Sequence, residues 1–273
     1  MNKGLPMGIG QKNHMKKAGI IGYGWLGSRI AEKLSEKFEI YTTTTTSDKE
    51  EYLNKKGFHP CIINFPDYLL SEKHVQWEAI KELDVLIITI PISGKNCCAS
   101  SLYNRIQNLF SFIGDFNGQI FLMSSTGVYP DLDQELKEED MSSDNVPGER
   151  MIKNKYPQVN ILRLAGLMGE DRFLSKYRVS NLNFFTNHIH YVDIGLVLEK
   201  MIDQKSQSKI YNVVAPLHPT KSEVINAQKN LENAEITDDP KGKKISSAKL
   251  ISELDFIFKY PDPKSFHEMS STE

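Results

Sequence analysis

The stretch that decides the fold runs from Ala18 to Leu34 and reads AGIIGYGWLGSRIAEKL. Small and apolar residues lead into a turn that contains three glycines, and apolar residues then recur with helical spacing. This pattern predicts a strand, a glycine turn and a helix. In such a unit the first glycine allows a tight turn, the second lets the backbone approach a pyrophosphate, and the third lets the helix pack closely on the strand.

The start of the predicted helix is a candidate site for a dinucleotide. The first amide groups of a helix lack partners within the helix, and its positive dipole end attracts phosphates. A glycine triplet alone is a weak signal, but here the strand before it and the helix after it both fit. The residues that we expect to contact the cofactor at this turn are Gly22, Gly24, Trp25, Leu26 and Gly27.

The composition is that of a globular chain with no strongly charged partner. Its 273 residues are 40% hydrophobic, and the net charge of −2 gives no reason to expect nucleic acid or an anionic membrane surface as a partner. No apolar run approaches the ~20 residues that span a bilayer. Cys61, Cys97 and Cys98 have no paired spacing, which favours a reducing, cytoplasmic compartment and speaks against a disulfide framework or a metal site.

Strands and helices alternate along the chain, which predicts an α/β fold: a Rossmann-type doubly wound parallel sheet with a small C-terminal substrate lobe. Residues 1–17 are expected to be a flexible extension, 18–166 an NAD(P)-binding Rossmann domain, and 167–273 a small lobe interwoven with the same sheet. The acidic stretch 131–144 is expected to be a solvated loop. Beyond the first strand, the predicted strands are 38–42, 58–65, 83–90, 119–123, 159–164 and 210–214, and a helix is predicted over 99–113.

The end of the second strand bears on the choice of cofactor. A NAD-binding unit usually has an Asp or Glu there for the ribose hydroxyls, whereas this chain has Thr42 to Thr46 followed by Ser47. Without that carboxylate a 2′-phosphate is not repelled, and Lys49 is near, so we expect NADP, with NAD as the alternative. The threonines could also simply end a strand. Thr43, Thr44 and, after the fourth strand, Pro91 are therefore expected to line the cofactor site.

Ile120 to Pro130, IFLMSSTGVYP, is the second informative stretch, because hydroxyl side chains follow a buried strand. Together with the glycine turn it resembles the short-chain dehydrogenase/reductase superfamily, in its extended, epimerase/dehydratase-like branch. ILRLAGLMGEDR (161–172), IHYVDIGL (189–196) and YNVVA (211–215) resemble further segments of that branch in the same order. The resemblance covers roughly Ala18 to Pro261 and implies a nicotinamide cofactor.

The resemblance also assigns roles to residues after the fifth strand. The family's catalytic Ser/Thr falls on Ser125, with Ser124 beside the cofactor and Thr126 beside the substrate. If Glu149 marks the family's helix, the Tyr and Lys of its Tyr-x-x-x-Lys pair fall on Met141 and Asn145, which cannot transfer a proton. Tyr129 is then the candidate proton donor by position, with a ring packed on the lobe as the alternative.

Other residues have weaker assignments. Tyr-x-x-x-Lys occurs at Tyr52 and at Tyr260, but outside the expected place in the chain. Arg172, at the entrance to the lobe, is a candidate clamp for an anionic substrate, and Arg163, within an apolar strand, is expected to form a buried pair. We also expect Asp193 to be the N-cap of the helix that follows it.

The sequence therefore predicts an NAD(P)-dependent oxidoreductase or epimerase of the atypical short-chain dehydrogenase/reductase type, acting on a small polar, sugar- or nucleotide-like substrate. The alternative is a sensor that binds NAD(P) and has lost catalysis with the missing pair. A β-hydroxyacid dehydrogenase is disfavoured, since such chains usually end in a largely helical domain. A homodimer is one possible assembly.

Overall fold

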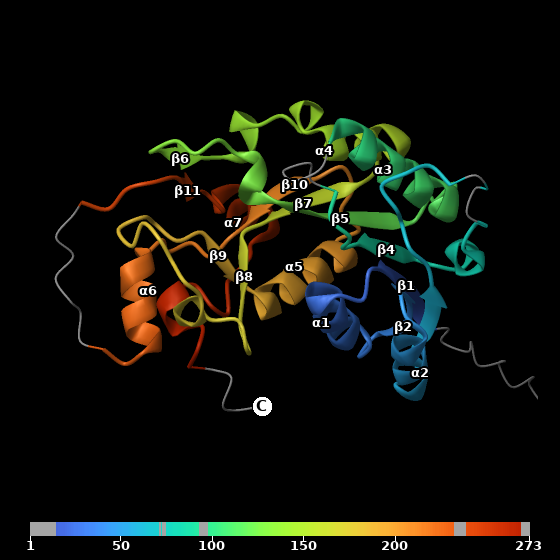
Figure 1. Ribbon diagram of the computed structural model, residues 1–273, viewed down its shortest axis with the longest axis horizontal. Helices are drawn as coiled ribbons and strands as arrows, with labels where there is room; N and C mark the ends of the chain where they lie inside the picture. The colour runs from blue at the N-terminus through green and yellow to red at the C-terminus, as the bar shows by residue number, and fades with distance from the viewer. Residues whose placement is uncertain (1–14, 71, 73–74, 93–97, 232–238, 269–273) are drawn as a thin grey trace, which may run out of the picture.

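The fold is built on one sheet of seven parallel strands. A computed structural model describes residues 15–70, 72, 75–92, 98–231 and 239–268. The strands lie in the order β10-β7-β5-β4-β1-β2-β3 (Figure 1), so the chain starts in the middle of the sheet and winds outward in both directions. This is the predicted doubly wound architecture. The strands are β1 (Lys16–Ile21), β2 (Phe38–Thr44), β3 (His59–Ile62), β4 (Val85–Ile88), β5 (Gln119–Ser125), β7 (Asn160–Leu164) and β10 (Ile210–Val213).

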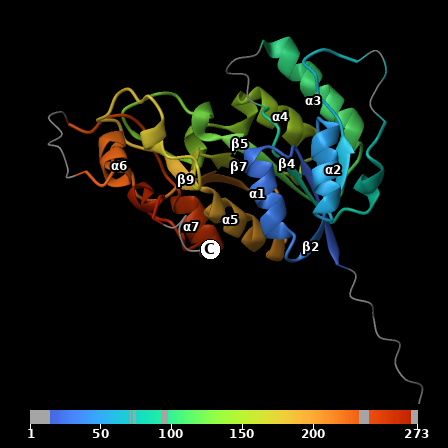
Figure 2. The same cartoon turned by 60° about the horizontal axis from the view of Figure 1, so that its bottom comes forward.

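Helices cover both faces of the sheet, and each face has its own apolar core. On one face the core includes residues of α1 (Trp25–Leu34), α2 (Ser47–Lys55), α5 (Tyr191–Asp203) and α7 (Ala248–Leu254). On the other face α3 (Ala99–Ile113) and α4 (Pro147–Lys155) pack on the sheet (Figures 1 and 2). The central strands are apolar on both sides for this reason: all four residues of β4 are buried.

A smaller lobe lies beyond the carboxyl ends of these strands. It contains the pair β8 (Gly166–Met168) with β9 (His188–His190), the pair β6 (Glu135–Leu136) with β11 (Lys244–Ile245), and the helix α6 (Lys221–Gln228). A third apolar cluster, which includes Met168, Val224 and Phe266, holds the lobe together. The chain returns from the lobe to the main sheet through α5 and β10.

Several predicted boundaries differ from the observed ones. β1 begins at Lys16, within the predicted extension, and residues 1–14 lie outside the described part of the chain. The third strand, predicted over eight residues, is the four-residue β3. The acidic stretch 131–144 is not simply a solvated loop, because it contains β6 and the buried residues Leu136 and Glu138. The carboxylate of Glu138 accepts a hydrogen bond from the backbone N–H of Asn212 at 2.7 Å, which ties this stretch to β10.

The N-cap of α5 is His190, and the prediction of Asp193 for this position is wrong. The Nδ1 atom of His190 accepts a hydrogen bond from the N–H of Val192 at 3.4 Å. Asp193 lies in the first turn of the helix, is fully buried, and accepts hydrogen bonds from the N–H groups of Lys259 and Tyr260 at 2.7 and 3.1 Å. Asp193 therefore joins the C-terminal segment to α5.

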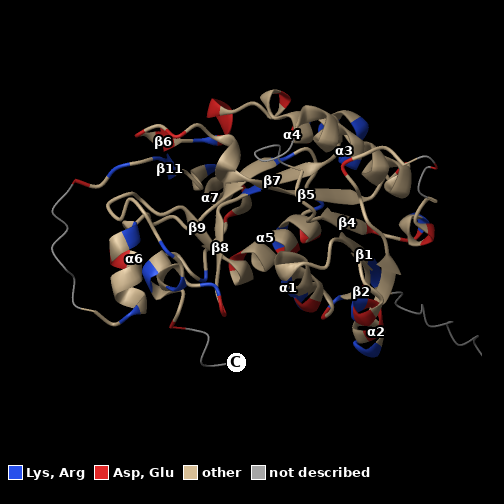
Figure 3. Cartoon of the chain, viewed as in Figure 1, with Lys and Arg blue, Asp and Glu red and all other residues tan. Residues whose placement is uncertain are grey.

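Charged residues of both signs are interspersed along the chain, as α2 illustrates in Figure 3. Among the helices of the described residues, none combines the length and the apolar character that crossing a membrane requires.

Candidate functional site

The glycine turn after β1 has the tight geometry that the sequence predicts. Gly22 has φ of 105°, a conformation that other residues rarely adopt, and its N–H donates to Oγ1 of Thr43 at 2.9 Å. A Cβ atom on Gly27 would lie 1.9 Å from the carbonyl oxygen of Gly22. Both positions therefore require glycine, because the turn and α1 are in close contact.

Gly24 is glycine for a different reason. It is exposed, and a Cβ atom there would meet no other atom within 4 Å. It is also the N-cap of α1, with no side chain that caps the helix and no acidic residue in the first turn. The first amides of α1 thus face open space at the positive end of the helix dipole, an arrangement that favours an anionic group.

One pocket opens directly on this turn, and we call it the glycine-turn pocket. Its volume is about 720 Å³, and its lining includes Gly22, Gly24, Thr43, Thr44, Lys49 and Pro91. The Nζ atom of Lys49 donates to the carbonyl oxygen of Tyr23 at 2.8 Å, which holds the ammonium group at the edge of the pocket. Of the predicted cofactor residues, this pocket brings together Gly22, Gly24, Thr43, Thr44 and Pro91, whereas Leu26 lines another pocket.

Arg105 of α3 also lines the glycine-turn pocket, and sequence reasoning missed it. Its guanidinium pairs with Asp67 at 2.7 Å and donates to the carbonyl oxygen of Pro91 at 2.8 Å. Nothing in the local sequence marks Arg105, because α3 comes to this edge of the sheet only when the sheet forms. Residues 93–97, which come shortly after Pro91 in the chain, lie outside the described residues.

A second pocket, the serine pocket, lies at the ends of β4, β5 and β7. Its volume is about 240 Å³, and its lining includes Leu26, Pro91, Ser124, Ser125 and Glu149. Ser125 is exposed, and its Oγ accepts the N–H of Gly127 at 3.0 Å, so the side chain caps the short turn 126–128. Its hydroxyl proton is still available to a ligand in the pocket.

Ser124 and Glu149 form the polar end of the serine pocket. The Oγ of Ser124 donates to Oε1 of Glu149 at 2.6 Å. The buried carboxylate of Glu149 pairs in turn with Arg163 at 2.8 Å, which confirms the expected buried pair for Arg163. Arg163 also donates to the carbonyl oxygen of Met141 at 2.8 Å.

The structure contradicts a proton-donor role for Tyr129. Only 2% of this residue is exposed, and its hydroxyl donates to Oδ1 of Asn212 at 2.7 Å while it accepts from Arg163 at 2.9 Å. Burial, the largest cause, raises the pKa of the phenol. Tyr129 is therefore a core residue, bonded to β7 and β10 of the main sheet.

The positions of the missing pair also lie outside the serine pocket. Met141 and Asn145 precede α4, in two short turns, so they do not share the face of a helix as the family's pair does. The two matches elsewhere are also remote from Ser125. Tyr52 is exposed on α2, and Tyr260 packs in the third apolar cluster.

Of the two predicted substrate residues, Thr126 lines a third pocket, in the lobe, and Arg172 lies elsewhere. The guanidinium of Arg172 lies over the Trp25 ring, 4.1 Å from its centroid, and Arg29 lies 4.0 Å from the same ring. Trp25 Nε1 donates to Asp171 at 3.3 Å. Trp25 therefore joins α1 to the segment after β8, and in this arrangement Arg172 is not beside Ser125.

Comparisons with known proteins agree with this architecture. No protein-family model matches the chain. Protein YeeZ of Escherichia coli strain K12 is 27% identical to it, over 91% of this chain and 98% of that protein. Among solved structures, dTDP-glucose 4,6-dehydratase from Bacillus anthracis in complex with NAD has a TM-score of 0.67 at 13% identity, covering 93% of this chain and 95% of that one. Human epimerase family protein SDR39U1 with NADPH has a TM-score of 0.61 at 11% identity, covering 94% and 100%.

The chain thus has a Rossmann-type fold of the kind seen in these solved epimerase and dehydratase structures. The predicted fold class and the resemblance seen in the sequence are confirmed at the level of the fold. At these identities the solved structures define the fold and leave the reaction to be argued from the site.

Proposed function

We propose that this protein binds a nicotinamide dinucleotide across the carboxyl edge of its sheet. The ADP half would occupy the glycine-turn pocket, the diphosphate would lie on the first amides of α1, and the nicotinamide half would enter the serine pocket. The observation that carries this proposal is that the two pockets meet: Pro91 lines both, and α1 contributes its N-cap Gly24 to one and Leu26 to the other. Among the solved structures of this fold, one is in complex with NAD and another is with NADPH.

NADP is the cofactor that the glycine-turn pocket favours. Its β2 side consists of threonines, with Thr43 already bonded to Gly22 and Lys49 at the edge. The carboxylate of Asp67 also lines the pocket, but the guanidinium of Arg105 pairs with it. A 2′-phosphate there would meet one available cation, Lys49, and no unpaired carboxylate among the described lining residues.

We further propose that the reaction is an oxidation–reduction or an epimerisation of a small polar substrate. Hydride transfer belongs to the cofactor, so the protein has mainly to position the substrate beside it. Ser125 is suited to this, because its exposed hydroxyl points from the end of β5 at the border of the serine pocket. Glu149 is the one ionisable side chain among the described residues that line this pocket, and its carboxylate is held by Ser124 and Arg163.

A sensor without catalysis is the second candidate, and a specific observation favours it. Of the described residues that line the serine pocket, none is a Tyr or a Lys, and most are apolar. Such a pocket can hold a nicotinamide ring without providing the acid that the family uses. The two candidates share the same binding site and differ only in turnover.

Titration with NADPH and NADH, followed by cofactor fluorescence, tests the binding proposal. Gly24→Asp places a negative charge where the diphosphate would lie, and we expect it to abolish binding. Asn54→Asp, on the exposed side of α2, makes the same charge change away from the pockets and should bind as the wild type does. If neither cofactor binds the wild type, or if Gly24→Asp binds it equally well, the proposal is wrong.

Turnover separates the two candidates. The wild type and Ser125→Ala would be incubated with NADP and a panel of sugars and hydroxy acids while absorbance of the reduced nicotinamide is followed. The enzyme hypothesis is supported if the wild type changes the absorbance of the reduced nicotinamide and Ser125→Ala does not, while both bind the cofactor with the same affinity. Cofactor binding with no turnover on any compound supports the sensor.

A further inference from the structure

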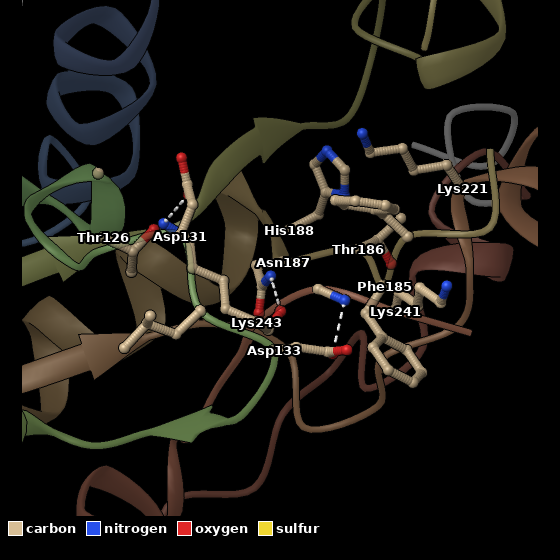
Figure 4. Close-up of a pocket in the computed structure, with 14 residues that line it drawn as sticks. Thr126, Asp131, Asp133, Phe185, Thr186, Asn187, His188, Lys221, Lys241 and Lys243 are labelled. Carbon is tan, nitrogen blue, oxygen red and sulfur yellow. Dashed lines mark hydrogen bonds and ion pairs between the residues drawn. The ribbon is translucent and has the colours of Figure 1, made fainter. Parts of the chain in front are cut away.

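The lobe contains a pocket that the proposed cofactor would leave free. It has a volume of about 530 Å³ and lies between the turn after β5, the segment 184–188 before β9, and the segment 241–243 before β11 (Figure 4). We call it the lobe pocket. Lys221 of α6 lines it, as do Lys241 and Lys243 of the segment before β11, together with His188, Asp131 and Asp133.

Two of the lysines are fixed to the same residue of the wall. The N–H of Lys221 donates to the carbonyl oxygen of Phe184 at 2.9 Å, and Lys241 forms a bridge with Phe184, flanked by hydrogen bonds of 2.9 and 3.1 Å. The Lys221 ammonium lies 5.5 Å from the centroid of the Phe184 ring. The backbone therefore holds both lysines at one end of the pocket, as Figure 4 shows for their side chains relative to Thr126.

The acidic groups of the pocket already have partners. Asp131 pairs with Lys243 at 2.8 Å, and Asp133 accepts the N–H of Gly242 at 2.9 Å. Among the described residues, the Lys221 ammonium donates only to the carbonyl oxygen of Ser180, at 3.1 Å, and the Lys241 ammonium has no polar partner. With three lysines against two aspartates, the end near Lys221 and Lys241 carries the uncompensated positive charge.

A buried histidine nitrogen is the second sign of a ligand at this end. The Nδ1 atom of His188 is buried and has no hydrogen-bond partner among the described residues. Such an orphaned atom is costly unless a ligand or water satisfies it. Burial and the charge of Lys221, in that order, lower the pKa of His188 to about 4, so the ring is neutral at pH 7 and can donate one hydrogen bond.

The other end of the lobe pocket adjoins the proposed reaction site. Thr126 and Gly127 line the lobe pocket, whereas Ser125, the residue before them, lines the serine pocket. The hydrogen bond from Gly127 to Ser125 fixes this turn between the two pockets. A ligand in the lobe pocket would therefore have one end at the lysines and the other beside Ser125.

We propose that the lobe pocket binds the anionic end of the substrate, a carboxylate or phosphate group held by Lys221 and Lys241. This inference rests on the proposed function and narrows its substrate to small polar anions. The anion would lie within reach of the charged ammonium groups and of the His188 ring, which are the donors that an oxyanion requires. The reacting carbon would lie over the turn at Thr126, towards Ser125.

Ligand-observed NMR on the full chain tests the anion site, with inorganic phosphate and benzoate as separate probes at constant ionic strength. We expect saturable binding that weakens by about fivefold in Lys221→Gln and in Lys241→Gln, since each loses one charged donor. Lys229→Gln is the matched control, because Lys229 is an exposed lysine at the other end of α6. The better-bound probe distinguishes a phosphate from a carboxylate substrate.

Two results would contradict the anion site, and an NADPH titration separates it from the proposed function. If neither probe binds the wild type, or if all three lysine variants bind equally well, the anion site is wrong. NADPH titration of the same samples reports on the proposed function separately: the lysine variants should keep wild-type cofactor affinity. Anion binding without any NADPH binding would overturn the proposed function and, with it, the assignment of this anion as a substrate group.

Discussion

The carboxylate of Glu149, in the first turn of α4, pairs with the guanidinium of Arg163 on β7 at 2.8 Å, and both side chains are fully buried. The same carboxylate accepts a hydrogen bond from the Ser124 hydroxyl, with 2.6 Å between the two oxygen atoms. The pair thus fixes α4 to the sheet and holds the serine that borders the serine pocket. Because Arg163 also bonds Tyr129, one buried network connects the pocket to β10 through Asn212.

Glu149→Gln tests the importance of this network for stability. Removing one partner of a buried ion pair leaves the other charge uncompensated, so we expect a loss of about 3–5 kcal/mol in the free energy of unfolding. Lys155 lies on the same helix as Glu149, and Lys155→Ala, which breaks its exposed pair with Asp115, should cost about 0–1 kcal/mol. Urea denaturation of both variants measures the difference, and equal losses would contradict the assignment.

Substitutions at two glycines of the turn should have different effects, one on the stability of the fold and the other on NADPH binding. In Gly27→Ala the new methyl group would overlap the carbonyl oxygen of Gly22, so we expect a loss of about 1–3 kcal/mol in the free energy of unfolding. In Gly24→Ala the methyl group enters open space, so the fold should be retained while NADPH affinity falls by about tenfold. Denaturation and NADPH titration on both variants check this. A stable Gly27→Ala, or a Gly24→Ala that binds normally, would refute it.

Lys49 should determine the preference for NADPH over NADH. An ammonium group that meets a 2′-phosphate contributes a charge-assisted contact that NADH cannot make, so Lys49→Ala should weaken NADPH binding by about tenfold and leave NADH binding within about twofold. Lys55→Ala, which removes an exposed lysine of the same helix, is the control. Equal losses for the two cofactors would show that Lys49 acts only by holding the carbonyl of Tyr23.

His190 should make the protein less stable in acid. Burial, the largest cause, lowers its pKa from 6.5 to about 4, so below pH 6.5 the unfolded chain binds a proton that the folded protein does not. The free energy of unfolding therefore falls as the pH drops from 6.5 to 4, by about 3 kcal/mol from this residue. Asp193, whose pKa burial raises to about 6, contributes in the opposite sense.

His190→Phe isolates this contribution. The phenyl ring can keep the contacts with Tyr260 and Phe266, and the lost cap on α5 should cost about 1 kcal/mol at every pH. Denaturation at several pH values should therefore give a variant whose stability falls less steeply in acid than that of the wild type. Parallel curves would show that His190 does not titrate as expected.

Much of the site could be predicted from the sequence because it depends on local contacts. The turn at Gly22 and the open N-terminus at Gly24 follow from residues close together in the chain, and so does Ser125 at the end of its strand. Tyr129 could not be assigned in this way. Its neighbours suggest a loop over the cofactor, and only the packing of β7 and β10 shows that its hydroxyl is bonded to Arg163 and Asn212.

The sequence by itself determined the doubly wound sheet and the position of the glycine turn, since apolar periodicity and glycine spacing act within one strand–turn–helix unit. Only the tertiary structure decided which basic side chains line the same pocket. Arg105 reaches the glycine-turn pocket from α3, and Lys221 and Lys241 meet at Phe184 in the lobe. Such contacts between distant segments depend on how the helices pack on the sheet, and this packing cannot be predicted from the residues that are close to a side chain in sequence.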